Sequence, residues 1–317
     1  MATGEQYVNE SGAAAAAESA PGTVGPPRKP RASRTGMVPP AALLAAIAAA
    51  VGVAAVSAAP TPSPAAVAQA AAPADGQLEN PGDDVVAPVP VAPDDLAALP
   101  QAVTDATVAN APPDRDRGSA PSGQLVHPTT AVAVYASPGG TPIAALPPTE
   151  FGGDTWVPVI GKRPGWVQVM LPVRPNGASG WIYLDDPAVT LARTPFRLVV
   201  DRAAFALSLV QDGRQVARWT VGVGKPESVT PPGRTFVLAY VRPDHPTYSR
   251  LVLPLGAHSD TYLSYGGASG TTGIHAWTYT DSVLGKQSSD GCIRVPQQAL
   301  DALVNLNVPV GTPVLIK

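Results

Sequence analysis

Two residues near the C-terminus could carry out nucleophilic chemistry, a cysteine and a histidine. Cys292 is the only cysteine of the 317-residue chain, and it follows the turn-forming sequence Ser289-Asp290-Gly291. His275, one of four histidines, precedes it at the sequence distance of a β-hairpin. A solitary thiol and an imidazole in this frame predict nucleophilic catalysis, in which the sulfur attacks and the imidazole moves its proton.

Acyl transfer by a thiol requires an acid for the leaving amine and hydrogen-bond donors for the oxyanion. His275 is the candidate general acid and base for Cys292, because no other histidine lies near it in the sequence. Gly291 gives the backbone the freedom for a tight turn, so that amides around Cys292 can face a substrate oxygen. We expect both reactive residues at strand ends, where a rigid sheet can hold them together.

The composition argues against several other classes of function. The formal net charge of -3 is close to neutral, which does not favour nucleic acid as a partner. The chain has no glycine-rich phosphate loop, and a zinc site of cysteines and histidines needs more than one cysteine and closer spacing. We therefore expect no metal and no other cofactor.

The N-terminal part of the sequence predicts export. Residues 1–36 form a basic leader, and residues 37–59 form an uncharged, alanine-rich apolar run. Basic residues before such a run indicate a cytoplasmic N-terminus and an exported C-terminus. The run is either a single-pass membrane anchor, which the long leader favours, or a cleaved signal peptide. We expect the protein in the cell envelope outside the cytoplasm, membrane-anchored or secreted, where a single thiol without a disulfide partner is a candidate reactive group.

Residues 60–123 have the composition of a linker. They hold 12 prolines and show almost no hydrophobic periodicity. Apart from Tyr7, every aromatic residue of the chain lies at or beyond Tyr135. A segment so poor in large apolar residues cannot offset its ordering entropy, so we expect a disordered Pro/Ala-rich tether.

Residues 124–192 are predicted to form short strands separated by turns, and all-β is the fold class expected for the whole folded part. The pattern VYASPGG…W…GWVQV…GWIYL resembles small bacterial SH3-like barrels. Three tryptophans lie in this region, and we expect them in the core because a small barrel needs large residues to fill it. They are Trp156, Trp166 and Trp181.

Residues 193–317 continue the β pattern and are predicted to form a second domain. Strands are expected at residues 196–200, 204–210, 215–223, 234–241 and 314–317. A short amphipathic helix is expected at residues 297–306, because Pro296 favours a helix start and Leu300, Leu303 and Val304 recur at helical spacing.

The second domain resembles the L,D-transpeptidases of the YkuD family, which cross-link bacterial peptidoglycan. The family motif is H…(S/T)-x-G-C-x-(R/N), and the matching positions are His275, Ser289, Gly291, Cys292 and Arg294. The resemblance implies a β-sandwich catalytic domain and a thioester on Cys292, with the carbonyl of Ala276 orienting the imidazole. It also implies peptidoglycan stem peptides as substrates and penem-type β-lactams as inhibitors. The segment with Gly222, Gly224, Thr230-Pro231 and Gly233 looks like a further element of the family.

One position departs from the family pattern. Asp290 stands where histidine is the commonest family residue. A carboxylate beside Cys292 would raise the pKa of the thiol, which opposes nucleophilic attack. We therefore expect Asp290 either to point away or to pair with a cation such as Arg294 or Lys286.

Further candidates for substrate binding are less strongly marked. Arg294 is expected either to bind the carboxylate of a stem peptide or to form a salt bridge within the fold. Ser289 is expected to hold the turn and to face the substrate, and Tyr262, Tyr265 and Trp277 are candidate pocket walls with a core position as the alternative.

Three functions remain open from the sequence. The first is a peptidoglycan L,D-transpeptidase that forms 3→3 cross-links between stem peptides. The second keeps the Cys292 thioester and changes the acceptor, giving an L,D-carboxypeptidase or an enzyme that attaches proteins to the wall. The third is a non-catalytic protein that binds the cell wall, with the SH3-like unit as the reader.

Overall fold

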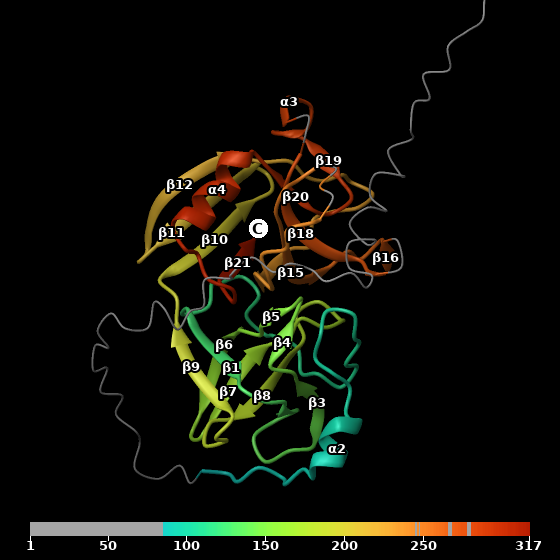
Figure 1. Ribbon diagram of the computed structural model, residues 1–317, viewed down its shortest axis with the longest axis vertical. Helices are drawn as coiled ribbons and strands as arrows, with labels where there is room; N and C mark the ends of the chain where they lie inside the picture. The colour runs from blue at the N-terminus through green and yellow to red at the C-terminus, as the bar shows by residue number, and fades with distance from the viewer. Residues whose placement is uncertain (1–84, 245, 247, 266–267, 278–279) are drawn as a thin grey trace, which may run out of the picture. The chain divides into compact units, whose positions relative to one another are not determined.

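The structure is a computed structural model of the chain. It describes residues 85–317 apart from residues 245, 247, 266, 267, 278 and 279. All of the described residues belong to one unit. Strands dominate this part of the chain and helices are few (Figure 1), so the predicted all-β class is confirmed in its coarse form.

The first sheet contains seven strands in the order β3-β2-β8-β7-β6-β1-β9. Valines at alternating positions fill its buried face, as expected for strands with one face in a core. A short pair, β4 (Thr149–Glu150) and β5 (Gly153–Asp154), stands beside it. The seven strands are β1 (Gln124–Pro128), β2 (Val132–Tyr135), β3 (Pro142–Leu146), β6 (Val157–Arg163), β7 (Trp166–Met170), β8 (Ser179–Tyr183) and β9 (Val189–Arg193).

The predicted SH3-like barrel is not found in closed form. β3 and β9 are the end strands of the sheet, and no pairing between them closes it among the described residues. The expected core role is confirmed for Trp156 and Trp166, which are buried. Trp181 is only partly buried, because its strand β8 turns this side chain to the less covered face.

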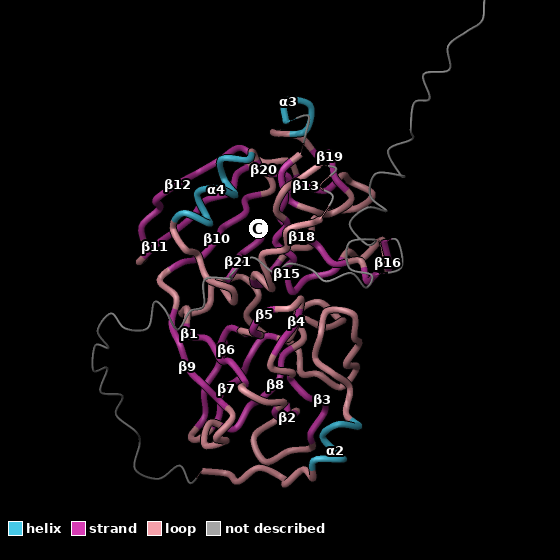
Figure 2. The backbone as a smooth tube through the Cα atoms, in the orientation of Figure 1, coloured by secondary structure: helices cyan, strands magenta, loops and turns pink. Residues whose placement is uncertain are grey.

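The predicted linker does not extend over residues 85–123. This segment contains a short helix, α2 (Pro93–Ala98), and otherwise runs as loop (Figure 2). It buries Ala102 and Val108 in the core of the seven-stranded sheet. The segment is held by three isolated bridges, Gln101–Ala145 to β3 and Thr107–Arg174 and Pro113–Ala178 to the connection between β7 and β8. Backbone pairing thus compensates for its lack of large apolar side chains.

The C-terminal part of the chain is built on two main sheets. A five-stranded sheet has the order β12-β11-β10-β21-β14, and a three-stranded sheet has the order β15-β18-β20. The strands of the first are β10 (Phe196–Asp201), β11 (Ala206–Gln211), β12 (Arg214–Thr220), β14 (Gly233–Phe236) and β21 (Pro313–Ile316). Those of the second are β15 (Val252–His258), β18 (Thr271–Ala276) and β20 (Ile293–Val295).

Smaller elements complete this part. β13 (Val223–Gly224) runs parallel to β19 (Gln287–Ser289), and β16 (Ser264–Tyr265) pairs with β17 (Ala268–Ser269). Two helices follow, the single-turn α3 (Thr280–Val283) and α4 (Gln297–Asn305). The predicted helix is confirmed as α4, with Pro296 at its N-cap, one position earlier than the first helical residue.

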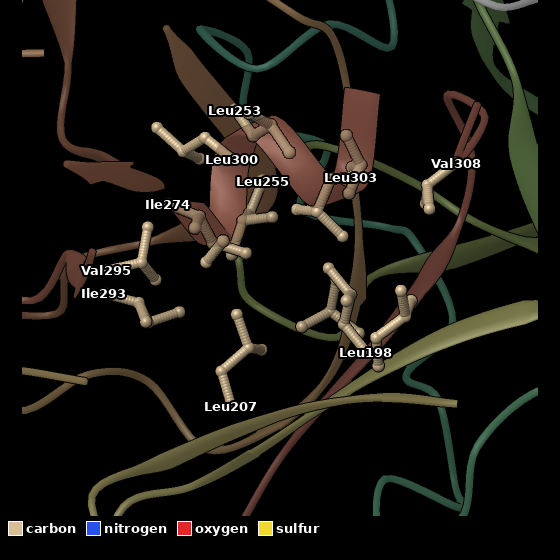
Figure 3. Packing of buried hydrophobic residues seen from close by; sticks show 14 of the residues in the cluster. Leu198, Leu207, Leu253, Leu255, Ile274, Ile293, Val295, Leu300, Leu303 and Val308 are labelled. Atoms are coloured by element: carbon tan, nitrogen blue, oxygen red, sulfur yellow. The ribbon is translucent and has the colours of Figure 1, made fainter. Parts of the chain in front are cut away.

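One hydrophobic core joins the two C-terminal sheets and α4. Figure 3 shows Leu198 and Leu207 from the five-stranded sheet, Leu253 and Ile274 from the three-stranded sheet, and Leu300 from α4. All five side chains are fully buried or nearly so. Burial of a leucine or isoleucine side chain contributes about 1.5–3 kcal/mol, so this core holds β18 and β20 firmly in place.

The predicted membrane segment lies outside the described residues. Residues 1–36, 37–59 and 60–84 are not described, so the leader, the apolar run and the first part of the linker stay predictions. Among the helices of the described part, none has the length and apolar character needed to span a bilayer.

Candidate active site

The three-stranded sheet separates core residues from reactive residues by simple alternation. In the parallel pair β18–β20, Ile274 lies opposite Ile293, and both side chains belong to the core. The next pair, His275 and Arg294, must then project from the opposite face, because successive strand residues alternate. The segments GIHA and CIRV therefore give this sheet one apolar face. The opposite face carries His275 and Arg294 and is called the chemical face.

Cys292 joins this chemical face. It immediately precedes β20, and extending the register by one residue brings it beside Gly273. A backbone hydrogen bond between Gly273 and the thiol agrees with this placement. His275 is then the diagonal neighbour of Cys292, and Cα atoms at such positions are about 7–8 Å apart, within reach of their side chains. The structure therefore brings together the two residues that the sequence singled out.

The turn before Cys292 is fixed by its own hydrogen bonds. The Ser289 hydroxyl donates to the carbonyl of Cys292 at 2.6 Å and accepts from the amide of Gly291 at 3.2 Å. Gly291 has a φ of 118°, a conformation that residues with a Cβ rarely adopt. The predicted turn role of Ser289 and Gly291 is thus visible in the geometry. Because the serine hydroxyl is engaged within the turn, Ser289 acts on the site through Cys292.

The imidazole of His275 is held in one orientation. Its Nδ1 lies 2.7 Å from the carbonyl oxygen of Ala276. A carbonyl oxygen only accepts, so Nδ1 carries the proton and Nε2 of the neutral ring is left with a lone pair. Among the described residues Nε2 has no hydrogen-bond partner. The Ala276 peptide is itself fixed, because its amide donates to the Ser249 hydroxyl at 3.0 Å.

Burial keeps this histidine neutral. Desolvation lowers the pKa of His275 to about 4, with Arg294 acting in the same direction and the Ala276 hydrogen bond opposing it. The side chain is 1% exposed. At neutral pH the ring is therefore an acceptor that is able to take a proton at Nε2.

The thiol is also in a desolvated environment. Burial raises the pKa of Cys292, and Asp290 adds to this effect, whereas the Gly273 hydrogen bond and Arg294 lower it. Cys292 is 7% exposed, so most of this residue is shielded from solvent. A thiol in these surroundings needs a base beside it to become a nucleophile, and His275 is the imidazole on the same face.

Aromatic side chains and a guanidinium form one wall of the site. The Tyr248 ring lies 5.0 Å from the His275 ring and 5.5 Å from the Trp277 ring, centroid to centroid. The Arg294 guanidinium stacks over Trp277 at 3.9 Å and donates to the Ser288 carbonyl at 2.8 Å. No salt bridge to Arg294 is present in the described part of the chain.

Asp290 pairs with a cation that the sequence did not indicate. Its Oδ1 lies 2.8 Å from Nζ of Lys225, whereas the expected partners were Arg294 and Lys286. Lys286 instead donates to the carbonyl of Ser282. The expectation of a paired carboxylate is therefore correct, and the predicted partners are wrong.

Tyr262 and Tyr265 are the remaining predicted residues of the site. Tyr262 lies near Lys225, whose pKa it helps to raise, and its amide donates to the Ser259 hydroxyl. Tyr265 belongs to β16, and its side chain lies outside the described part of the structure.

Sequence reasoning missed three residues of the site: Tyr248, Ser249 and Lys225. The first two lie in a stretch without strand periodicity, which gave no signal. Lys225 follows Gly224 in the segment that resembles a family element, and that position was the available clue.

No metal centre is indicated. In the ranges that the structure describes, no group of three or more histidine, cysteine, aspartate or glutamate residues could hold an ion.

The family comparison agrees with the geometry. Residues 195–316 match the YkuD family model, the L,D-transpeptidase catalytic domain. This match supports the resemblance predicted for the C-terminal part of the chain. No curated protein matches the chain significantly.

Solved structures of L,D-transpeptidases share weak similarity with the chain. One from Mycobacterium smegmatis is 18% identical, with 48% of this chain and 90% of the other covered and a TM-score of 0.33. The catalytic domain of the E. faecium enzyme is 21% identical, with 38% and 96% covered and a TM-score of 0.29. L,D-transpeptidase 3 from Mycobacterium tuberculosis is 16% identical, with 53% and 76% covered and a TM-score of 0.33.

Proposed function

We propose that the chain is a peptidoglycan L,D-transpeptidase that forms 3→3 cross-links through a thioester on Cys292. The observation that carries this proposal is the shared face of β18 and β20, where Cys292 lies diagonally beside a neutral His275. The Ala276 carbonyl fixes the proton on Nδ1 and leaves Nε2 for the thiol. The family match at residues 195–316 supplies the reaction class.

The reaction begins with proton transfer from the Cys292 thiol to Nε2 of His275. The sulfur then attacks the carbonyl that joins the third residue of a donor stem to its terminal D-alanine. The carbon–nitrogen bond breaks, and the imidazolium returns the proton to the leaving amine, so that D-alanine departs and a thioester remains.

The second half repeats these steps in reverse. The side-chain amine of the third residue of an acceptor stem attacks the thioester and gives a proton to Nε2 of His275. The carbon–sulfur bond breaks, and the proton passes to the sulfur, which restores the thiol. Gly291 shapes the turn whose amides would face the oxyanion in both halves.

The other residues of the site act by position. Ser289 holds the turn, and the Trp277 ring with the Arg294 guanidinium forms a wall on which a stem peptide could lie. We propose that Arg294 meets the carboxylate of a stem, because its Nε has no hydrogen-bond partner among the described residues. Tyr262 and Tyr265 stay proposals as pocket residues.

The location of the protein is part of the proposal. Substrates in peptidoglycan require a catalytic domain outside the cytoplasm, and the apolar run of residues 37–59 would deliver it there, as an anchor or as a signal peptide.

A penem tests the nucleophile directly. The strained β-lactam carbonyl is an acyl donor for an activated thiol, so the wild-type protein should gain the mass of one penem, and Cys292→Ser should gain it far more slowly. Cys292→Ala is the blank and should gain none. An unmodified wild-type protein, or equal labelling of Cys292→Ala, contradicts the proposal.

The acceptor is tested with disaccharide-tetrapeptide muropeptides. Dimers joined 3→3 support transpeptidation, tripeptide alone indicates a carboxypeptidase, and label on a protein lysine indicates attachment to the wall. Binding to purified sacculi that survives Cys292→Ala, without any turnover by the wild type, indicates a non-catalytic wall-binding protein.

A further inference from the structure

Lys225 occupies a backbone position that is fixed from two sides. Its amide donates to the Ser289 carbonyl at 2.9 Å, which extends the parallel pairing of β13 with β19. Its carbonyl accepts from the amide of Ser228 at 2.9 Å, which closes a tight turn. The Gly224 amide donates to the Thr230 hydroxyl, and a Cβ on Gly224 would lie 2.2 Å from the Ser228 carbonyl oxygen. The segment around Gly224 and Thr230, which resembles a family element, therefore fixes the backbone position of Lys225.

The side chain of Lys225 reaches the turn that carries the proposed nucleophile. Its Nζ lies 2.8 Å from Oδ1 of Asp290, and the carboxylate side chain is only 9% exposed. Glu227 is a weaker partner at 3.6 Å, and its side chain is 65% exposed. A carboxylate buried without a counter-charge is costly, so this ammonium stabilises Asp290 at its position.

Asp290 matters because Cys292, the proposed nucleophile, follows it two residues later. The thiol of Cys292 must lose its proton to react, and a nearby negative charge opposes that loss. The groups that face the sulfur are Asp290 from its own turn, Arg294 from β20, the neutral His275 from β18 and Tyr248. Arg294 favours the thiolate and Asp290 disfavours it, so the balance depends on whether Asp290 is neutralised.

We propose that Lys225 is a positioning residue for acyl transfer, which neutralises Asp290 and holds the turn so that a carboxylate can stand beside the nucleophile without impeding it. This inference rests on the proposed function of Cys292. The pair replaces one polar residue of the family motif by two residues from separate segments of the chain, an aspartate and a lysine. Lys225 touches neither substrate nor sulfur and acts through Asp290 alone.

The solitary cysteine allows the inference to be tested without substrate. The ultraviolet absorbance of the thiolate is titrated in the full chain, with Cys292→Ala as the blank for tyrosine absorbance. Lys225→Met should move the midpoint upward by about one pH unit, since it removes the ammonium that pairs with the Asp290 carboxylate. Lys225→Arg keeps the charge and should stay close to the wild type. Adding Asp290→Asn to Lys225→Met should return the midpoint to the wild-type position or below it.

Three outcomes would overturn the inference. The first is a folded Lys225→Met protein with the wild-type midpoint. The second is a double variant with the same raised midpoint as Lys225→Met, because the effect would then not pass through Asp290. The third applies if Lys225→Met alone does not fold, and it is a double variant with a midpoint above that of the wild type. In that case a midpoint at or below that of the wild type supports the inference.

The rate of penem acylation separates this inference from the proposed function. Lys225→Met should react about tenfold more slowly than the wild type at neutral pH and recover when the pH is raised by about one unit, because the rate follows the thiolate fraction. A slow rate that higher pH does not restore indicates a structural role and contradicts the inference. If the wild type itself is not acylated, the proposed function fails, and the absorbance titration still reports on the pair.

Discussion

Two buried histidines stand at opposite ends of the same pair of strands. In the antiparallel pair β15–β18, His275 lies opposite Val252 and His258 lies opposite Thr271. Burial lowers the pKa of each to about 4. Each ring donates to a backbone carbonyl, His275 through Nδ1 to Ala276 and His258 through Nε2 to Thr104 at 2.6 Å. In each, the other ring nitrogen has no hydrogen-bond partner among the described residues.

The two ends differ in the residues that neighbouring segments of the chain place beside each histidine. At the His275 end Cys292, the proposed proton donor to the ring, lies directly before β20. At the His258 end Thr104 contacts the strands, and its hydroxyl lies 3.1 Å from Nε2 of His258 and 2.9 Å from the Thr271 hydroxyl. A buried, oriented, neutral imidazole is therefore common to both ends and does not by itself mark a candidate catalytic site. The adjacent nucleophile distinguishes the two ends.

The largest test of this comparison exchanges each histidine for glutamine. His275→Gln removes the proposed general base and should slow penem acylation of Cys292 by about 10²–10⁴-fold. His258→Gln keeps a hydrogen-bonding side chain at the other end and should change that rate by less than about twofold. Rates of mass gain measured for both variants check the difference. Equal losses at the two ends would break the comparison.

The second test uses acid stability, which both ends should share. The unfolded chain binds a proton on each histidine below the ordinary pKa of 6.5, whereas the folded protein binds it only below about 4. The unfolded state therefore holds more protons in this window, and the free energy of unfolding falls as the pH is lowered from about 7 to about 4. Each histidine contributes up to roughly 3 kcal/mol to this loss.

Denaturant unfolding at a series of pH values measures the effect. His258→Gln removes one of the two titrating groups and should make the stability of the variant less dependent on pH than that of the wild type. The carboxylates that also titrate in acid are the same in both proteins and cancel in the difference. A constant difference between the two proteins at all pH values would show that His258 does not titrate as expected.

Much of the His275 end could be predicted from the sequence because it is local. Alternation along GIHA and CIRV decides which residues face the core and which face the site, so His275 and Cys292 follow from pattern. The Ser289 turn with Gly291 follows from turn chemistry, and α4 follows from helical periodicity. The identity of these elements needs no knowledge of distant contacts.

The remainder depends on contacts that a single sequence does not encode visibly. Lys225 meets Asp290 only because β13 runs beside β19. Tyr248 reaches the imidazole from a stretch with no periodic pattern. Residues 85–123 fold against the first sheet although their composition is that of a linker, because backbone bridges and small buried residues hold them. Composition measures how much apolar surface a segment offers and cannot measure pairing with a sheet edge.

The smallest test compares the hydroxyl that supports each end. Ser249→Ala leaves the Ala276 amide and the Leu251 carbonyl without the hydroxyl that joins them. Thr104→Val removes the hydroxyl that lies between His258 and Thr271. Each change should lower the free energy of unfolding by about 1–3 kcal/mol, because buried polar groups lose partners.

Only one of these variants should affect the reaction. Ser249 fixes the peptide whose carbonyl orients His275, so Ser249→Ala should also slow penem acylation by about tenfold through misplacement of the imidazole. Thr104→Val should leave the rate unchanged at a matched loss of stability. Denaturant unfolding and single-turnover mass gain on the same preparations measure the two effects. A loss of rate that simply follows the loss of stability in both variants would mean that the Ala276 carbonyl does not guide the imidazole.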